Sequence, residues 1–214
     1  MRSVDPIPGN PWPHEMTITV EDSPSALLEL LWIRGAHGLD FDSEDFPPLL
    51  ADPPAAANGS GPSASVRAGW ERAWSRLWRA AAQHAGQDQD PVQFERLHQT
   101  ANGSPERLQI LQELFGPSWR DEFGDAAFDD PSFRGWSERG SDKHMSSMSR
   151  PLAESPEHRD LDALIRAWRN GLTRVVTIPC RGEFSRKITD NALLVTDATR
   201  ADSSAYQRAL DSFD

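Results

Sequence analysis

The sequence predicts an α+β fold in which a small antiparallel sheet packs against a predominantly helical middle. Within residues 155–213 the spacing of apolar residues changes from the period of a helix to that of a strand and back. A second β-branched segment, residues 17–20, lies near the other end of the chain, and helical patterns occupy most of the sequence between the two. We expect residues 17–20 to join the C-terminal sheet, so that residues 16–214 form a single domain.

The first helix is expected to begin at Ser23-Pro24, because serine is a good N-cap and proline fits the first turn of a helix. The residues from Leu27 to Ile33 are apolar on nearly all sides. This composition predicts a helix that is buried on several faces.

Three stretches are expected to lack regular structure. Residues 1–15 contain four prolines and predict a flexible lead-in, after which the patterned sequence starts at Met16, an alternative start to Met1. A tract rich in proline, alanine, glycine and serine predicts a mobile loop at about 47–65. A polar stretch predicts another loop at about 140–153.

The longest helix is expected over residues 66–85, which carry Trp70, Trp74 and Trp78 at intervals of four. This interval places the three indoles on one face of a helix. Large apolar groups at helical spacing are more typical of a core than of a binding surface, so we expect these tryptophans to be buried.

Two shorter helices and a set of helical turns are expected to follow. The first covers residues 91–97, and the second starts at the cap Ser104. Residues 118–139 predict short helical turns that carry several aromatic side chains. Four residues of the second helix are expected to point inward: Leu108, Leu111, Leu114 and Phe115.

The C-terminal region predicts a helix, three strands and a helix. Ser155 caps a helix that ends near Gly171, and the strands alternate until Thr196 with a turn at Asp190-Asn191. Asp202 then caps the last helix. Five residues form the apolar stripe of the first of these helices: Leu161, Leu164, Ile165, Trp168 and Leu172.

Composition restricts the classes of function. The formal net charge of −11 disfavours general binding of nucleic acid or anionic membranes. No run approaches the roughly 20 apolar residues that span a bilayer, and the first fifteen residues lack a secretory signal. Cys180 is the only cysteine, which excludes an intramolecular disulfide. We expect a soluble cytoplasmic protein without a cofactor.

Two pairs of residues have the spacing of metal ligands. Glu95 and His98 match the E-x-x-H spacing of di-iron helices, but a second such motif is absent from the sequence. His158 and Asp162 lie four apart near a helix start. We interpret both pairs as surface residues and expect no metal site.

Cys180 is a candidate nucleophile because Arg181 follows it and would favour a thiolate. The alternating pattern instead places it as a half-buried strand residue, which is the interpretation that we prefer.

An acidic aromatic segment, residues 115–136, is the first candidate binding site. Aromatic side chains next to carboxylates line clefts for polar or cationic ligands. The same side chains would also serve to attach a loop to the body of the protein, and the sequence leaves both alternatives open. The candidate ligand-binding residues are Trp119, Asp121, Phe128 and Trp136.

A basic segment, residues 159–187, is the second candidate. It contains seven basic residues against three acidic ones, a net charge of +4 in an acidic chain. A helix followed by a basic hairpin is typical of a winged-helix nucleic-acid binder, although an acidic partner surface explains the charge more simply. The candidate interaction residues are Arg166, Arg169, Arg174 and Arg186.

These observations favour a binding module for another protein or a small ligand, without catalysis. The enzymatic alternative is a hydrolase or a metal-dependent enzyme with its site in the helical middle. The nucleic-acid alternative uses the basic segment 159–187.

Overall fold

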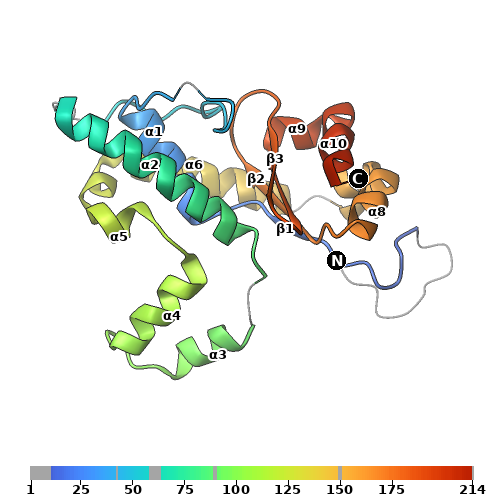
Figure 1. Cartoon of the computed structure of the whole chain (residues 1–214), viewed down its shortest axis with the longest axis horizontal. Coiled ribbons are helices and arrows are strands. Elements are labelled where there is room, and N and C mark those ends of the chain that lie inside the picture. Colours follow the sequence, from blue (N-terminus) through green and yellow to red (C-terminus); the bar gives the residue numbers. More distant parts are fainter. Residues whose placement is uncertain (1–10, 42, 58–63, 89–90, 149–150, 214) are drawn as a thin grey trace.

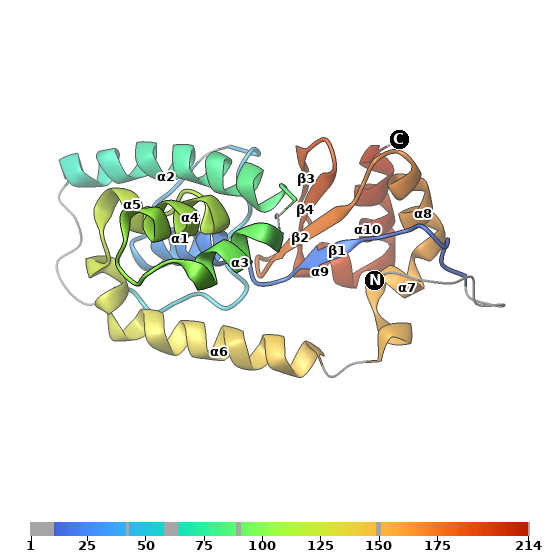
Figure 2. The ribbon, with the colours of Figure 1, turned by 90° about the horizontal axis from the view of Figure 1, so that it is seen from below.

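The computed structural model describes residues 11–41, 43–57, 64–88, 91–148 and 151–213. A four-stranded sheet in the order β1-β2-β4-β3 separates two layers of helices (Figures 1 and 2). The strands are β1 (Thr19–Glu21), β2 (Arg174–Ile178), β3 (Ser185–Thr189) and β4 (Ala192–Thr196). The α+β class is confirmed, and the predicted N-terminal segment joins the C-terminal sheet through β1.

The sheet is mixed rather than wholly antiparallel. β3 pairs antiparallel with β4, but β4 also pairs parallel with β2, and β2 pairs parallel with β1. β2 and β4 are buried along their whole length, whereas three of the five residues of β3 are exposed. The two strands that are apolar on both faces therefore lie together at the centre, and the polar β3 takes the edge.

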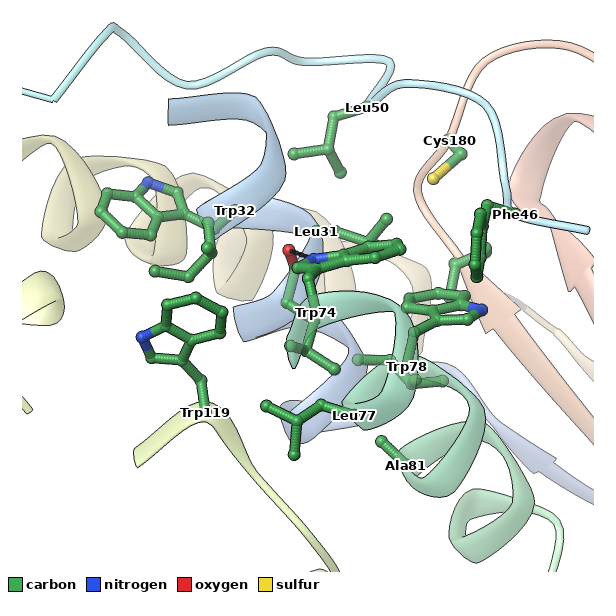
Figure 3. Packing of buried hydrophobic residues seen from close by; sticks show 14 of the residues in the cluster. Leu31, Trp32, Phe46, Leu50, Trp74, Leu77, Trp78, Ala81, Trp119 and Cys180 are labelled. Carbon is green, nitrogen blue, oxygen red and sulfur yellow. Dashed lines mark hydrogen bonds between the residues drawn. The ribbon is translucent and has the colours of Figure 1, made fainter. Parts of the chain in front are cut away.

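One face of the sheet is covered by α1 (Ser25–Ala36) and α2 (Ala64–Ala85). As predicted, α1 is buried on several sides, and Trp74 and Trp78 of α2 are buried in the core (Figure 3). Trp70 is only half-buried against this core. Trp74 and Trp78 stack with their ring centroids 5.2 Å apart, and the indole Nε1 of Trp74 donates a hydrogen bond to the carbonyl oxygen of Leu30 at 2.6 Å. From the sheet, Val176, Ile178 and Leu194 join this core, and Cys180 joins it from the segment that follows β2.

The opposite face is covered by α7 (Pro156–Arg159), α8 (Leu161–Arg169), α9 (Asp197–Ala201) and α10 (Ser203–Leu210). The single helix predicted after Ser155 is divided at Asp160, whose backbone leaves the helical region. The buried carboxylate of Asp160 accepts hydrogen bonds from α10 instead. The caps predicted at Ser155 and Asp202 are confirmed, whereas the short α9 was not predicted.

The remaining helices extend the layer formed by α1 and α2. They are α3 (Pro91–Gln99), α4 (Pro105–Phe115), α5 (Trp119–Phe123) and α6 (Pro131–Met148), with 3-10 turns at Ala126–Asp129, Leu152–Glu154 and Asp211–Phe213. α6 runs along one side of the molecule, and α3 and α4 extend away from the sheet (Figures 1 and 2). None of the helices in the described ranges is long and apolar enough to cross a membrane.

Two predictions about these helices were wrong. Residues 140–148, expected as part of a loop, continue α6, because this polar stretch is held to the body by contacts of Lys143 with Asp197 and of His144 with Asp22. In α4 the buried residues are Ile110 and Leu114, whereas Leu108 and Phe115 are exposed. Two residues advance about 200° around a helix, so Leu108 lies nearly opposite Ile110.

The expected loops at 1–15 and 47–65 fall partly outside the described residues, which omit 1–10, 42 and 58–63. In the described part of the second loop, Leu50 is buried and pairs with Cys180, and the backbone N–H of Ala51 donates to the carbonyl oxygen of Pro179 at 2.9 Å. These contacts hold the first part of the 47–65 loop against the core instead of leaving it mobile.

Candidate functional site

A pocket of about 170 Å³ lies where the start of α1, the end of α2, the end of α4, β1 and β2 meet. We call it the α1–β2 pocket. Its polar lining consists of Glu21, Ser23, Ser25, His84 and Arg174, and its apolar lining includes Leu27, Ala81, Ala85, Leu114 and Phe115. The pocket thus combines three kinds of ionisable side chain with an apolar wall.

Arg174 is the first residue of β2, and its side chain lies on the sheet face that α1 and α2 cover. Alternation along a strand places it on the same side as Val176 and Ile178, which belong to the core beneath α1 and α2. Arg174 is only 7% exposed, and its Nε has no hydrogen-bond partner. Burying this N–H group without a partner costs free energy, and an anion beside the guanidinium would stabilise its charge.

The N-terminus of α1 adds a second positive element to the pocket. Pro24 is the N-cap, no side chain caps the helix, and no acidic residue lies in its first turn. The first N–H groups of a helix have no intrahelical partner and carry the positive end of the helix dipole. Ser25, Ala26 and Leu27, which supply these groups, all line the pocket.

Glu21 is the last residue of β1 and brings a carboxylate to the same pocket. It pairs with Val176 in the parallel register, so its side chain lies on the same sheet face as Arg174. A carboxylate oxygen of Glu21 accepts a hydrogen bond from the backbone N–H of Ser23 at 3.3 Å. Among the described residues, no carboxylate forms an ion pair with Arg174.

His84 lines the pocket from the end of α2 and is held by the end of α4. Its Nε2 lies 2.9 Å from the carbonyl oxygen of Glu113, so Nε2 carries the proton and donates. The ring packs against Gly116, where a Cβ would lie 2.4 Å from the imidazole Cγ. Gly116 also has a φ of 69°, which favours glycine. The close approach fixes the orientation of the imidazole.

The candidate residues of segment 115–136 lie elsewhere. Trp119, Phe128 and Trp136 are buried in the core of the α1–α2 layer, where Trp119 contacts Trp70 edge-on and Trp136 donates to the carbonyl oxygen of Asp52 at 3.1 Å. Their position matches the alternative in which aromatic side chains attach the segment to the body.

Asp121, the fourth of these candidates, is exposed and completes a capping box with Ser118 at the start of α5. The structure therefore gives this carboxylate a local role in helix capping. From the acidic aromatic segment only Phe115, at its first position, reaches the α1–β2 pocket.

The four basic candidates do not form one surface. Arg166 on α8 pairs with Asp211, and Arg186 on β3 pairs with Asp45 at 2.8 Å. Arg169 is exposed on α8, on the opposite side of the sheet from the α1–β2 pocket. Of the four, only Arg174 enters the pocket.

The candidate metal ligands remain apart. Among the described residues, no group of three or more histidine, cysteine, aspartate or glutamate side chains is placed to hold a metal ion. Glu95 is exposed on α3, and the ring of His158 lies against Trp12 with a centroid separation of 6.4 Å.

Cys180 is fully enclosed in the core. It is 1% exposed, and burial raises the pKa of its thiol to about 12, although the nearby Arg34 acts in the opposite direction. The thiol is therefore neutral at physiological pH, in contrast to the thiolate that its neighbour Arg181 suggested.

A second cluster of buried polar groups joins α7 to α9 and α10. Arg200 donates from Nε and Nη2 to the two carboxylate oxygens of Glu157, both at 2.8 Å, and the hydroxyl of Tyr206 donates to Glu157 at 3.1 Å. Glu157 and Tyr206 are almost fully buried. Burial and the adjacent Glu157 carboxylate raise the pKa of the Tyr206 phenol, which therefore stays protonated as a donor.

Asp160 extends this cluster. Its carboxylate accepts hydrogen bonds from Ser203, from Gln207 at 2.8 Å and from the adjacent Arg159. Burial raises the pKa of Asp160, but the hydrogen bonds from these three partners outweigh it and bring the pKa below its usual range. The polar groups of the cluster satisfy one another, and this is typical of a structural contact between helices.

Sequence reasoning missed Glu21, Ser25, His84 and Phe115 as neighbours, because the pocket joins five elements that are far apart in the chain. One signal was present. The helix start at Ser23-Pro24 lacks an acidic residue in its first turn, which leaves the helix dipole without a compensating charge.

Comparison with known proteins finds no matching family model, no similar curated protein and no similar solved structure. The α1–β2 pocket is therefore interpreted from its own chemistry.

Proposed function

We propose that the protein binds a small anion in the α1–β2 pocket and does not act on it chemically. The observation that carries this proposal is the buried Nε of Arg174, which has no partner in the protein. An anion in the pocket would neutralise the guanidinium and accept hydrogen bonds from its terminal Nη groups, which are not among the buried atoms without a partner. Charge-assisted hydrogen bonds of this kind are among the strongest in proteins.

The N-terminus of α1 supports the same assignment. Its free N–H groups and dipole favour an anion, and the helix has neither a side-chain cap nor an acidic first turn of its own. The hydroxyl groups of Ser23 and Ser25 lie in the same lining and add further donors. The positive groups therefore converge from one helix and one strand.

The size of the pocket limits the ligand to a small molecule. Its volume of 170 Å³ is close to that of the engineered cavity of about 150 Å³ that binds benzene. It lies below the range of about 300–1,000 Å³ that is typical of sites for drug-sized ligands. A short carboxylate or inorganic phosphate fits this range, whereas a nucleotide exceeds it.

The arrangement of the imidazole favours binding without catalysis. Ser23 and Ser25 line the pocket, and a serine hydroxyl can act as a nucleophile. Such a nucleophile needs a base within hydrogen-bond reach. Among the described residues His84 forms no hydrogen bond with either serine, and its Nε2 is directed to the carbonyl oxygen of Glu113. The expected cytoplasmic location and the expected absence of a cofactor stay predictions.

The test is thermal unfolding in the presence of small anions. Acetate, propanoate, 4-methylpentanoate and inorganic phosphate are added at matched ionic strength, with sodium chloride as the reference. An anion present at ten times its Kd stabilises the folded protein by about 1.4 kcal/mol, which raises the Tm by about 3–5 °C for a chain of this size.

The matched variants are Arg174→Met and Arg169→Met. Both remove a guanidinium, but Arg174 is buried in the pocket and Arg169 is exposed on α8. We expect the anion-dependent shift to disappear in Arg174→Met and to persist in Arg169→Met. An equal shift in both variants, or no shift with any anion in the unmodified protein, contradicts the proposal.

A further inference from the structure

The α1–β2 pocket contains a negative group as well as its positive ones. Glu21 and Arg174 lie on adjacent strands, two residues apart in register, and their side chains lie on the same face of the sheet. Strand spacing places their Cα atoms about 8 Å apart. Although the charges are opposite, the two side chains form no ion pair among the described residues.

This separation favours a ligand that carries both charges. The formal charges of Glu21 and Arg174 cancel, and the N-terminus of α1 adds a partial positive charge of about half an elementary charge. A dianion such as phosphate would be repelled by the Glu21 carboxylate, whereas a ligand with a carboxylate and an ammonium group would pair with both side chains. Such a ligand would occupy the gap between them.

Much of the remaining lining of the pocket is apolar. Leu27, Ala81 and Ala85 contribute to it from α1 and α2, and Leu114 and Phe115 contribute from the end of α4. Phe115 is 56% exposed although it lines the pocket, so its ring has apolar surface for a ligand to cover. Covering this surface favours a ligand with an apolar side chain.

We propose that the ligand is a small apolar α-amino acid, an inference that rests on the proposed function. Its carboxylate is held by Arg174 and the N-terminus of α1, and its ammonium group by Glu21. Its side chain packs against Phe115. Alanine, valine and leucine have the required charges, and their size agrees with the pocket volume of 170 Å³.

The test is calorimetric titration of the full chain with three matched series. The first contains L-alanine, L-valine and L-leucine. The second contains the acids that lack the amino group, propanoate, 3-methylbutanoate and 4-methylpentanoate. The third contains the amines that lack the carboxylate, ethylamine, 2-methylpropylamine and 3-methylbutylamine.

We expect at least one amino acid to bind about tenfold or more tightly than its deaminated acid, since a hydrogen bond to a charged group is lost in the acid. The corresponding amine should not bind measurably, because it lacks the group that pairs with Arg174. In Glu21→Gln the affinity for the amino acid should fall about tenfold, while that for the acid should stay the same or rise.

The control variant is Glu183→Gln, which removes an exposed carboxylate that pairs with Arg208 outside the pocket. It should leave every affinity unchanged. If the deaminated acid binds as tightly as the amino acid, the assignment of an amino acid is wrong and anion binding stands. If no amino acid or deaminated acid binds, and no anion raises the Tm in the test of the proposed function, both proposals are wrong.

Discussion

Two arginines on opposite faces of the sheet have different surroundings. Arg200, on the α9 side, is half-buried and makes two hydrogen bonds of 2.8 Å with the buried carboxylate of Glu157. Arg174, on the α1 side, is buried, and its Nε has no partner. Both guanidiniums lose hydration on folding, and only one of them is compensated within the chain.

The difference separates a structural contact from a binding site. A buried ion pair with its hydrogen bonds complete joins two helices and leaves no group for a ligand. A buried charge without a partner stores a desolvation cost that an incoming anion would offset. Substitutions in these two environments should therefore differ in their effect on stability.

Replacement of Glu157 by glutamine is expected to destabilise the protein most. The substitution keeps the shape of the side chain but leaves the Arg200 guanidinium without its counter-charge, which costs about 3 kcal/mol for a buried pair. Urea denaturation measures the change in the free energy of unfolding. The control Glu183→Gln disrupts the exposed pair with Arg208 and should cost less than about 1 kcal/mol. If both variants lose the same free energy of unfolding, the Glu157–Arg200 pair stabilises the fold no more than an exposed ion pair does.

The second prediction concerns the acid dependence of stability near Asp160. The pKa of Asp160 is lowered in the folded protein, so its carboxylate stabilises the fold above its unfolded pKa of about 3.9 and loses this contribution as the pH falls through the folded pKa. We expect the free energy of unfolding of Asp160→Asn to fall less steeply below about pH 4 than that of the unmodified protein. Urea denaturation at a series of pH values measures this slope, and identical slopes would contradict the assignment.

Arg174→Met is expected to have a smaller effect on the stability of the ligand-free protein. Methionine covers much of the same apolar surface and removes an unpaired buried charge, so the free energy of unfolding should change by less than about 1 kcal/mol or increase. Urea denaturation without added anion provides the measurement. A loss of about 2 kcal/mol or more would mean that Arg174 stabilises the fold as Arg200 does.

The last prediction concerns the reactivity of Cys180, which lies in the core beneath α1 and α2 and should react least in the native protein. Its thiol is 1% exposed and burial raises its pKa to about 12, so almost no thiolate is present at pH 8. A chromogenic disulfide reagent should therefore react with the denatured protein and not with the native protein within an hour. Rapid stoichiometric reaction of the native protein would show that the core opens readily. Because Cys180 is the only cysteine, the signal is unambiguous.

The sequence predicted correctly the elements that depend on interactions between residues close together in the chain. The caps at Ser155 and Asp202 and the apolar strands near the C-terminus depend on residues within a few positions of one another, and all of them were identified. The parallel pairing of β2 with β4 was missed, because period-two alternation indicates which face a side chain occupies and not which strand lies beside it.

The candidate site depended on distant contacts and was mostly missed. Arg174 was identified for its charge, but its burial without a partner follows from the packing of α1 and α2 over β2, which no local pattern encodes. Trp119 and Phe128 were proposed as ligand-binding residues because aromatic side chains next to acids are common both in clefts and in cores. Only tertiary structure separates these two cases.

The most direct test of anion binding observes the Nε–H groups of Arg174 and Arg200 by NMR. Their resonances are assigned from the signals that disappear in Arg174→Met and in Arg200→Lys, and the unmodified protein is titrated with 4-methylpentanoate, which retains the carboxylate that Arg174 would bind. We predict that the Nε–H resonance of Arg174 moves on titration because the anion comes to lie beside its guanidinium, while that of Arg200, already bonded to Glu157, stays in place. An unchanged Arg174 resonance at a concentration that raises the Tm would contradict the account.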